Sequence, residues 1–210
     1  MKVLVFVASG ATGYNLVSQA LEKGHHVRAF VRDPSKLTIE NKNLSIFQGD
    51  VSNYQQVEDA VKDQEVVISA LGAATPFKRN FMLIKGIENI VGAMTKLHVE
   101  RLVYQSFLGV KENRKELGFL LDRIVSLVLK SSIQDHEVKE DIITSSNLQW
   151  TIVRCPTLTN GPFTGKYIHG ERIQSTSILP SLSRADVADF MLKELQEKKY
   201  IQKKPRIMSH

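Results

Sequence analysis

A short turn with two glycines carries the strongest chemical signal in the sequence. Gly10 and Gly13 stand between an apolar stretch that ends at Val7 and a stretch with helical spacing. Glycines at such a turn let the backbone approach a diphosphate closely, while free amides and the helix dipole stabilise its charge. The alternative is a pair of glycines that only shapes a turn. We expect a dinucleotide site, and its predicted residues in the turn are Val7, Ser9, Gly10, Ala11, Thr12 and Gly13.

Val7 departs from this pattern, because a further glycine is expected at its position. If the backbone of Val7 is extended, the turn keeps its shape. If the position requires a positive φ, a β-branched residue is costly there, and binding of the dinucleotide is weakened or lost. The sequence leaves both alternatives open.

The second predicted strand ends in a basic residue. A carboxylate at this position would bind a ribose 2′-hydroxyl, whereas Arg32 suits a 2′-phosphate, and Lys36 supplies a second positive charge. We therefore expect NADP(H) in preference to NAD(H), although Asp33 lies between the two cations. Asp50 is predicted either to face the adenine or to begin the next helix as a loop carboxylate. The remaining predicted cofactor-binding residues are Val51, Leu71, Gly72 and Ala73.

Two polar residues are candidates for catalysis. Ser106 ends the fifth predicted strand, where open α/β sheets bind ligands, so its hydroxyl is expected to contact a substrate oxygen or the nicotinamide amide. His136 is a candidate proton donor near neutral pH. The alternatives are a strand-end serine and a histidine that caps or lies on a helix. We interpret Asp135 and Glu140 as carboxylates that stabilise the fold.

A Tyr-x-x-x-Lys pair, which would protonate an alkoxide, is absent from the expected region, since no tyrosine occurs between Tyr104 and Tyr167. The only literal match, Tyr200 with Lys204, lies in a lysine-rich end that we interpret as solvated, and we regard it as coincidence. The expected reaction is therefore direct hydride transfer to a conjugated acceptor such as a flavin, quinone or tetrapyrrole. Phe77, Phe107 and Phe163 offer apolar or stacking surface for it, or belong to the core.

The order of elements predicts a single α/β domain over residues 1–210, a Rossmann-type doubly wound parallel sheet flanked by helices. Continuous apolar runs predict strands covered on both faces. The predicted strands are 3–7, 27–31, 44–47, 66–71, 102–105 and 150–154. The predicted helices begin after the glycine turn and end at Gly24, and then span 53–62, 81–97, 118–130, 135–145 and 184–193, with Ser183 as the N-cap of the last. Substrate-side loops are expected at about 72–80, 106–117 and 155–182.

Composition limits the other classes. The single cysteine, Cys155, excludes an internal disulfide, and no cysteine and histidine cluster predicts a metal. The apolar residues near the start are too few for a signal peptide or a membrane span, so we expect a cytoplasmic protein without a membrane partner. The net charge of +6 suits an anionic small ligand, and no nucleic-acid-binding stripe is present. We expect a small-molecule substrate and a monomer or small homo-oligomer.

Several motifs in order resemble one known family. They are the Gly10–Gly13 turn, Val31-Arg32-Asp33-Pro34 with Lys36, Gly49-Asp50-Val51, Ser106 with Gly109-Val110, Asp135-His136 with Glu140, Trp150 to Arg154 before Pro156, Gly165-Lys166-Tyr167, and Ser183 to Ala188. Together they are similar to the atypical short-chain dehydrogenases/reductases of the NmrA-like, biliverdin reductase B and flavin reductase type. The resemblance implies a Rossmann fold, NAD(P)H as cofactor and often reduction of flavins or quinones. The family also includes regulatory proteins that bind a dinucleotide without turnover, so an enzyme and a sensor both remain open.

Overall fold

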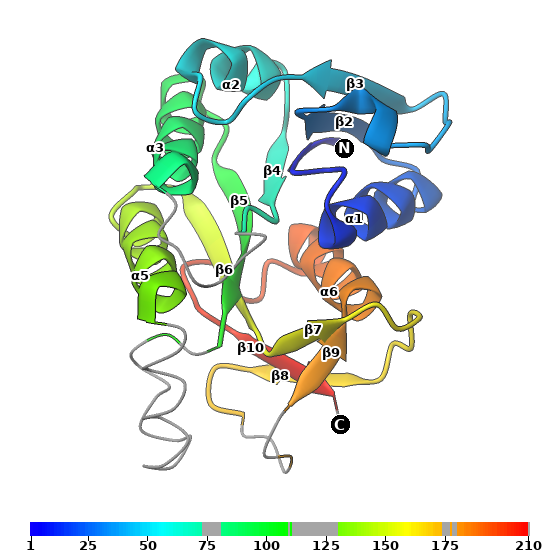
Figure 1. Cartoon of the computed structure of the whole chain (residues 1–210), viewed down its shortest axis with the longest axis vertical. Helices are drawn as coiled ribbons and strands as arrows, with labels where there is room; N and C mark the ends of the chain where they lie inside the picture. The colour runs from blue at the N-terminus through cyan, green and yellow to red at the C-terminus, as the bar shows by residue number, and fades with distance from the viewer. Residues whose placement is uncertain (73–80, 109, 111–129, 174–176, 178–179, 210) are drawn as a thin grey trace.

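The main sheet has the strand order of a Rossmann fold. A computed structural model of the chain describes residues 1–72, 81–108, 110, 130–173, 177 and 180–209. Eight strands follow the order β3-β2-β1-β4-β5-β6-β10-β8, and neighbouring strands are parallel except for β10 and β8 (Figure 1). The strands are β1 Lys2–Phe6, β2 His26–Val31, β3 Leu44–Gln48, β4 Val66–Ser69, β5 Arg101–Phe107, β6 Gln149–Cys155, β8 Tyr167–Gly170 and β10 Arg206–Ser209. A separate parallel pair joins β7 Thr157–Thr159 to β9 Ser181–Ser183.

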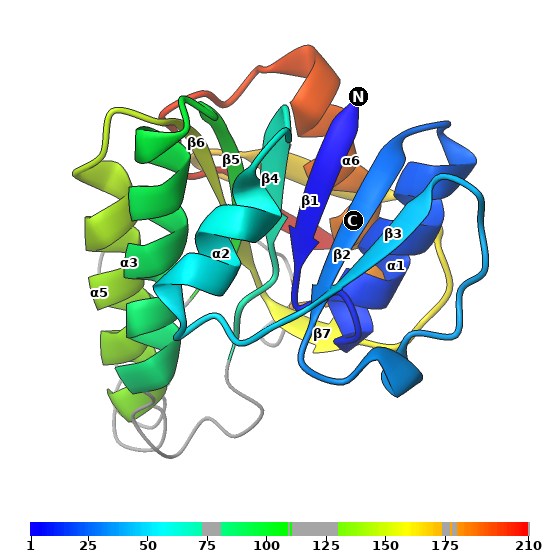
Figure 2. The same cartoon turned by 90° about the horizontal axis from the view of Figure 1, so that it is seen from above.

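Helices cover both faces of the sheet (Figure 2). One face carries α1 Ala11–Glu22 and α6 Arg184–Glu197, and the other carries α2 Tyr54–Val61, α3 Phe81–Lys96 and α5 Lys130–Thr144. Alternate residues of β1 serve the two layers, since Val3 and Val5 pack in the core with α1 and α6, while Leu4 and Phe6 pack in the core with α2 and α3. The prediction of a doubly wound parallel sheet is confirmed. Among the described helices, none is long and apolar enough to cross a membrane.

Local sequence signals explain where the helices begin and end. The Ser183 side chain accepts a hydrogen bond from the Asp186 amide at the start of α6, as predicted, and Asn53 accepts one from the Gln56 amide at the start of α2. Gly24 has a φ of 77° just after α1, in the left-handed region that ends many helices. A short 3-10 helix, η1 Pro34–Lys36, follows β2.

Some predicted boundaries were wrong. Strand β1 ends at Phe6 and not at Val7, β4 ends at Ser69 and not at Leu71, and α5 begins at Lys130 and not at Asp135. The helix predicted over 118–130 lies, except for Lys130, outside the described residues, and nothing tests it.

The prediction of a solvated C-terminal end holds for Lys198, Lys199 and Lys203, which are exposed, but was wrong for the residues between and after them. Tyr200 is 5 % exposed, and its carbonyl accepts a hydrogen bond from the Thr151 hydroxyl on β6. Residues beyond it form β10, in which Ile207 and Met208 are buried. Arg206 can enter this sheet because its guanidinium donates to the Ile173 carbonyl at 3.1 Å. The lysines of this segment obscured a four-residue strand whose apolar residues complete the sheet.

Candidate functional site

The glycine turn lies where the strand order reverses. Strand β1 has β2 on one side and β4 on the other, and the chain leaves β1 into the turn that begins α1. Open α/β sheets bind ligands at this switch point, outside the carboxyl ends of the strands. Within the turn, the Gly10 amide donates to the Val7 carbonyl at 2.9 Å, and no described side chain caps the amides at the start of α1. These amides are available to an anion.

Val7 adopts the costly one of the two predicted conformations. Its φ is 60°, in the left-handed region that disfavours a β-branched residue. Its side chain is half-buried, and a Cβ added to Gly10 would lie 3.1 Å from its Cγ1 atom. The isopropyl group therefore lies over the glycine that approaches a diphosphate in this type of site.

The two glycines meet the steric demands of a dinucleotide turn. A Cβ added to Gly13 would collide with the Val7 carbonyl, so only glycine lets the first turn of α1 pack this closely on the loop. The side chains of the neighbouring residues leave the entrance accessible, since Ala11 is exposed and Ser9 is half-buried, while Thr12 is buried beneath them. The described residues fit a bound diphosphate, with Val7 as the one obstruction.

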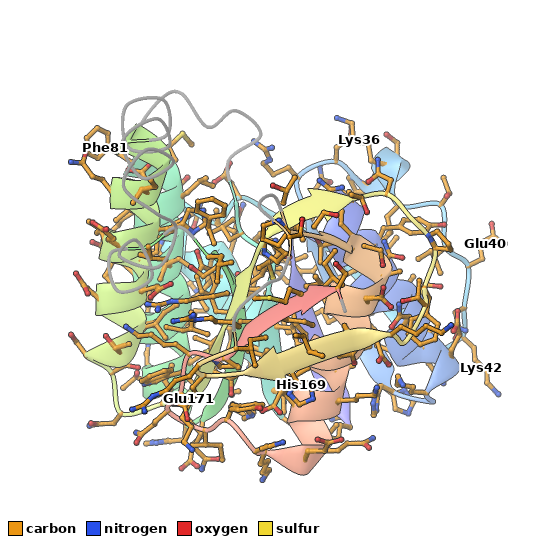
Figure 3. The ribbon with its side chains drawn as sticks, turned by 90° about the horizontal axis from the view of Figure 1, so that it is seen from below. Lys36, Glu40, Lys42, Phe81, His169 and Glu171 are labelled. Atoms are coloured by element: carbon orange, nitrogen blue, oxygen red, sulfur yellow. The ribbon has the colours of Figure 1, made fainter. Side chains whose placement is uncertain are left out.

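The cations predicted to bind a 2′-phosphate lie at the rim of this site. Arg32 is exposed just beyond β2. Lys36 extends into solvent (Figure 3), and its ammonium lies 3.6 Å from the Asp33 carboxylate. Asp33 in turn accepts the Ser35 hydroxyl and amide, which lowers the pKa of Asp33. Asp33 therefore neutralises part of the charge of Lys36, and Arg32 is the stronger candidate for the phosphate.

Asp50 has local partners, as its alternative interpretation predicted. Its carboxylate accepts the amide and the hydroxyl of Ser52 at 2.8 and 2.7 Å, and these bonds, with a smaller contribution from Arg32, lower its pKa. The backbone amide of Asp50 donates to the Gln56 side chain on α2. The carboxylate thus stabilises the loop before α2, and a contact with adenine stays a prediction.

The other predicted cofactor-binding residues lie around the ends of β3 and β4. Val51 is buried, and its carbonyl accepts the Asn89 side chain at 2.8 Å. Leu71 is buried, whereas Gly72 is exposed and no atom of the described residues lies within 4 Å of where its side chain would stand. Ala73, the last of this set, lies outside the described residues. A contact of Leu71, Gly72 or Ala73 with the cofactor stays a prediction.

Ser106 belongs to a buried polar cluster at the carboxyl end of β5. Its hydroxyl donates to Glu140 Oε1 at 2.6 Å and lies 3.5 Å from His136 Nδ1. Glu140 also accepts from Arg154 on β6, at 2.7 Å from Nη2 and 3.3 Å from Nε, and the Lys204 ammonium is 3.5 Å away. Glu140 is therefore the centre of the cluster, as expected for a carboxylate that stabilises the fold. Lys204 thus contacts Glu140, whereas the Tyr200 hydroxyl lies 3.0 Å from His169 Nδ1, so the two residues of the Tyr-x-x-x-Lys match have different partners.

His136 is neutral at physiological pH in this environment. Burial, with a contribution from the Lys139 charge, lowers the pKa of His136 to about 3. The ring lies 6.2 Å from the Phe107 ring, centroid to centroid. The imidazolium form, which is the proton-donating form of histidine, is therefore negligible near pH 7, and a role of His136 as proton donor stays a prediction.

Lys139 was not predicted from the sequence. It is 1 % exposed, and burial lowers its pKa to about 8 against the opposing effects of Asp135 and Glu140. Asp135 precedes it by one helical turn and Ile143 follows it by one, and both are buried. This spacing was the signal that could have placed Lys139 on the inner side of α5.

The remaining predictions concern metals and aromatic residues. The described residues contain no cluster of three or more His, Cys, Asp or Glu side chains able to hold a metal ion. Cys155 is buried as a free thiol. Phe163 is exposed on the loop after β7, and Phe77 lies outside the described residues.

The strand order and the glycine turn define a Rossmann-type dinucleotide-binding protein. The sequence profile of the family described as NAD(P)H-binding matches residues 8–198, so the chain belongs to the NAD(P)H-binding family. At this level, the resemblance to atypical short-chain dehydrogenases/reductases is confirmed.

Two curated relatives differ in how much of their length is shared. The chain is 32% identical to the uncharacterized chloroplastic protein At2g34460 of Arabidopsis thaliana in an alignment of 212 positions that covers 92% of this chain and 71% of the relative. It is 37% identical over 114 residues to a 3-beta-hydroxysteroid dehydrogenase of Mycolicibacterium neoaurum. That match covers 49% of this chain and 31% of the dehydrogenase, so the chain spans less than a third of that relative.

Three solved structures share the fold over almost the whole chain. The oxidoreductase ylbE of Lactococcus lactis has a TM-score of 0.83 at 18% identity and covers 100% of this chain and 91% of its own. A short-chain dehydrogenase/reductase of Veillonella parvula in complex with NADP has a TM-score of 0.79 at 20% identity, and the match covers 98% of this chain and 93% of its own. ChuY, an anaerobillin reductase of Escherichia coli O157:H7, has a TM-score of 0.78 at 20% identity, and the match covers 100% of this chain and 97% of its own.

Proposed function

We propose that this chain is an NADPH-dependent reductase that transfers hydride to a conjugated acceptor such as a flavin, quinone or tetrapyrrole. One observation carries the proposal: Ser106 and His136 lie together at the carboxyl end of β5, on the edge of the sheet that also carries the glycine turn. Reacting groups and dinucleotide meet at this edge in open α/β sheets. The reductase named ChuY and the NADP complex from Veillonella share the fold and support the proposal.

The described residues supply binding and orientation. The amides that begin α1 hold the diphosphate, and Arg32 pairs with the 2′-phosphate, which favours NADP(H) over NAD(H). Since the Ser106 hydroxyl proton is committed to Glu140, its oxygen is left as an acceptor. This favours a contact with the amide N–H groups of nicotinamide over a contact with a substrate oxygen.

The acceptor is defined by what the site lacks. When bound, NADPH would supply the hydride, and the reduced acceptor takes its proton from solvent. The chain has no Tyr-x-x-x-Lys pair in the expected region to protonate an alkoxide, so a conjugated acceptor suits it better than a simple carbonyl. We place this activity in the cytoplasm as a further proposal.

A second candidate is a protein that senses the dinucleotide without turnover. The departure at Val7 and the absence of a Tyr-x-x-x-Lys pair from the expected region favour it, because a sensor needs no catalytic geometry. Calorimetry with NADP⁺ and NAD⁺ measures binding, and the loss of absorbance of NADPH with FMN, menadione and biliverdin measures turnover. Oxidation of NADPH by any of these acceptors supports the reductase. Binding without oxidation of NADPH supports the sensor, and no binding of either nucleotide refutes both.

A further inference from the structure

Lys139 is a buried cation that no described residue pairs with directly. It lies on the inner side of α5, between the buried residues Asp135 and Ile143, and only 1 % of it is exposed. The carboxylates of Asp135 and Glu140 act on its ammonium through space, without a hydrogen bond. A buried charge is normally paired, because its removal from water is costly. The stability of the fold therefore gives no reason for this lysine.

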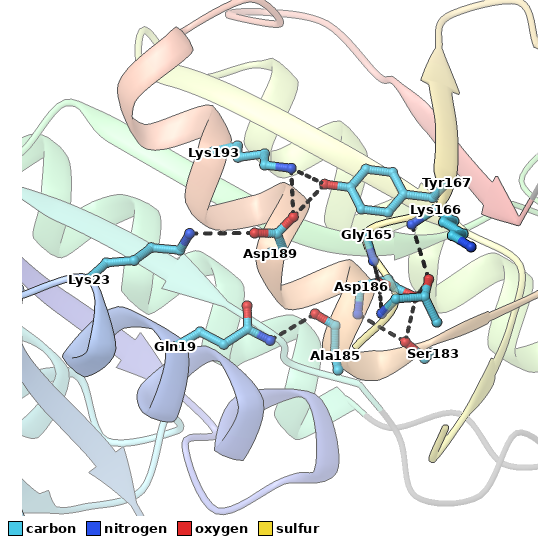
Figure 4. A network of polar contacts seen from close by, with 11 residues as sticks. Gln19, Lys23, Gly165, Lys166, Tyr167, Ser183, Ala185, Asp186, Asp189 and Lys193 are labelled. Atoms are coloured by element: carbon cyan, nitrogen blue, oxygen red, sulfur yellow. Dashed lines mark hydrogen bonds and ion pairs between the residues drawn. The ribbon is translucent and has the colours of Figure 1, made fainter. Parts of the chain in front are cut away.

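A buried charge on the opposite face of the sheet shows the usual arrangement. The Asp189 carboxylate on α6 accepts the Tyr167 hydroxyl at 2.7 Å (Figure 4). The same carboxylate lies 2.8 Å from the Lys193 ammonium and 3.5 Å from that of Lys23. Asp189 thus has three direct partners, whereas Lys139 is deeper in the protein and has none among the described residues.

The polar cluster around Glu140 contains more positive than negative groups. Arg154 lies 2.7 Å from the Glu140 carboxylate, and the Lys204 ammonium lies 3.5 Å from it. The third cation is Lys139, and the carboxylates are those of Asp135 and Glu140. Without Lys139 the described charges balance. With it, the cluster carries an excess positive charge.

This excess charge lies next to the two candidate reacting groups. Ser106 donates to Glu140 at 2.6 Å and lies 3.5 Å from His136 Nδ1. Burial and, to a smaller extent, the charge of Lys139 lower the pKa of His136, so the field of Lys139 reaches this ring. Helix α5, which carries both residues, packs against β5 and β6. The field of Lys139 is therefore felt at the site where we place the reaction.

Hydride transfer to a conjugated acceptor creates negative charge at this site. The hydride leaves with both electrons of its C–H bond and forms a new N–H or C–H bond on the acceptor. A neutral acceptor ring becomes an anion until a proton from solvent joins it. A fixed positive charge nearby lowers the energy of that anion and of the transition state that leads to it.

We propose that Lys139 stabilises the negative charge of the reduced acceptor through space, from its buried position beside Ser106 and His136. The proposal rests on the proposed reductase function and deepens it, because it favours acceptors whose reduced form is an anion, such as flavins. Lys139 does not touch the acceptor, so it is not a catalytic residue. It acts only through its charge.

The first test separates charge from structure. Lys139→Met keeps a long side chain without the charge, and kcat with FMN is expected to fall about tenfold at pH 7, as for one unit charge at roughly 10 Å, with the KM for NADPH within about twofold. The variant should also be more stable than the wild type, so unfolding cannot explain a lower kcat. Lys139→Arg keeps the charge and should stay within about threefold of the wild type. Lys96→Met, which removes the charge of an exposed pair with Glu58, is the matched control and leaves kcat unchanged.

The second test uses pH. Burial lowers the pKa of Lys139 to about 8, so its charge is present below that pH and lost above it. Wild-type kcat should therefore fall above about pH 8 toward the value of Lys139→Met, whose profile has no such step. The step should persist in Lys204→Met, which removes the other lysine of the cluster. The groups that face Lys139 on its own helix, on β6 and before β10 are Asp135, His136, Glu140, Arg154 and Lys204.

The third test does not depend on NADPH. Reduction of bound FMN with dithionite gives its midpoint potential, which should be about 30 mV lower in Lys139→Met, the equivalent of tenfold weaker binding of the reduced form. An unchanged potential, an unchanged kcat in Lys139→Met, or a step that disappears in Lys204→Met overturns the proposal. If the wild type oxidises NADPH with no acceptor while the potential of FMN still falls in Lys139→Met, the reductase function is refuted and the role of Lys139 at a ring-binding site is kept. If the wild type neither oxidises NADPH nor binds FMN, both are refuted.

Discussion

Replacing Val7 with glycine removes two features at once. It takes a β-branched residue out of the left-handed region, where Val7 has a φ of 60°, and it removes the isopropyl group that lies over Gly10. The two features affect different quantities. Backbone strain contributes to the free energy of unfolding, whereas the isopropyl group is expected to limit the approach of a diphosphate to Gly10.

The contributions to stability nearly cancel. Relief of the left-handed conformation stabilises the folded state by about 1–2 kcal/mol. Glycine costs about 0.5–1 kcal/mol in chain entropy, and loss of a half-buried isopropyl group costs about 1 kcal/mol. The free energy of unfolding of Val7→Gly is therefore expected to differ from that of the wild type by less than about 1 kcal/mol.

The effect on affinity is larger. With the isopropyl group removed, the diphosphate can reach at least one more amide at the start of α1, and a hydrogen bond to a charged group contributes about 1.5–3 kcal/mol. The Kd of NADP⁺ is therefore expected to fall about tenfold to a hundredfold. Calorimetry measures the Kd, and urea unfolding without nucleotide measures the stability.

Val7→Ala separates the two features. Alanine keeps most of the left-handed cost and loses the isopropyl group, so this variant should bind NADP⁺ more tightly than the wild type but be about 1 kcal/mol less stable. If Val7→Gly binds NADP⁺ no more tightly than the wild type, the isopropyl group does not limit the approach of the diphosphate, and the reasoning is refuted.

Three further predictions concern charges. Arg32→Ala should raise the Kd of NADP⁺ about tenfold through loss of a charge-assisted contact with the 2′-phosphate, while the Kd of NAD⁺ stays unchanged. Equal losses of affinity for both nucleotides in calorimetry would contradict this role of Arg32. Lys139→Met should stabilise the protein at pH 7 by about 3 kcal/mol, since folding lowers the pKa of Lys139 from 10.5 to about 8. Between pH 8 and 10.5 the unfolded state binds more protons than the folded state, so wild-type stability rises with pH and the advantage of Lys139→Met shrinks. A difference in the free energy of unfolding that stays constant from pH 7 to 10 would count against this prediction. Glu140→Gln should destabilise the protein by about 3 kcal/mol because the buried Arg154 loses its counter-charge. The control is Glu88→Gln, which removes the charge of an exposed ion pair with Lys85 and should change stability by less than about 0.5 kcal/mol. Similar urea midpoints for the two variants would exclude the role of Glu140.

Much of the fold could be predicted from the sequence because its strands are apolar on both sides. Val3 and Val5 face one helix layer and Leu4 and Phe6 the other, so the run has no alternation and points to a buried parallel strand. Strand β10 could not be predicted in the same way, because Arg206 precedes only two strongly apolar residues and its burial depends on a carbonyl far away in the sequence. A short strand that is held in place by pairing with a neighbouring strand shows little hydrophobic pattern of its own in the sequence.

The candidate site was predictable in part. The turn glycines, Ser106 and His136 could be named as candidates because each lies after a strand, near the end of a strand or on a helix beside that end. The sign of φ at Val7 could not be predicted, since either conformation is compatible with the same sequence. The contact of Glu140 with Arg154 also required the structure, because it depends on how α5 packs against β6. Lys139 could have been found from its helical spacing.

Two buried ion pairs show why burial of charge alone does not identify the site. Arg154 and Glu140 lie 2.7 Å apart, and Arg101 and Glu194 lie 3.7 Å apart; all four side chains are at most 5 % exposed. Arg101 begins β5, at the amino end of the sheet, and Glu194 accepts the Tyr200 amide, so this pair fastens the C-terminal segment. Glu140 instead binds the hydroxyl of Ser106 at the carboxyl end of β5. The two pairs therefore lie at opposite ends of neighbouring strands, and only the pair of Arg154 and Glu140 lies at the edge of the sheet that also carries the glycine turn.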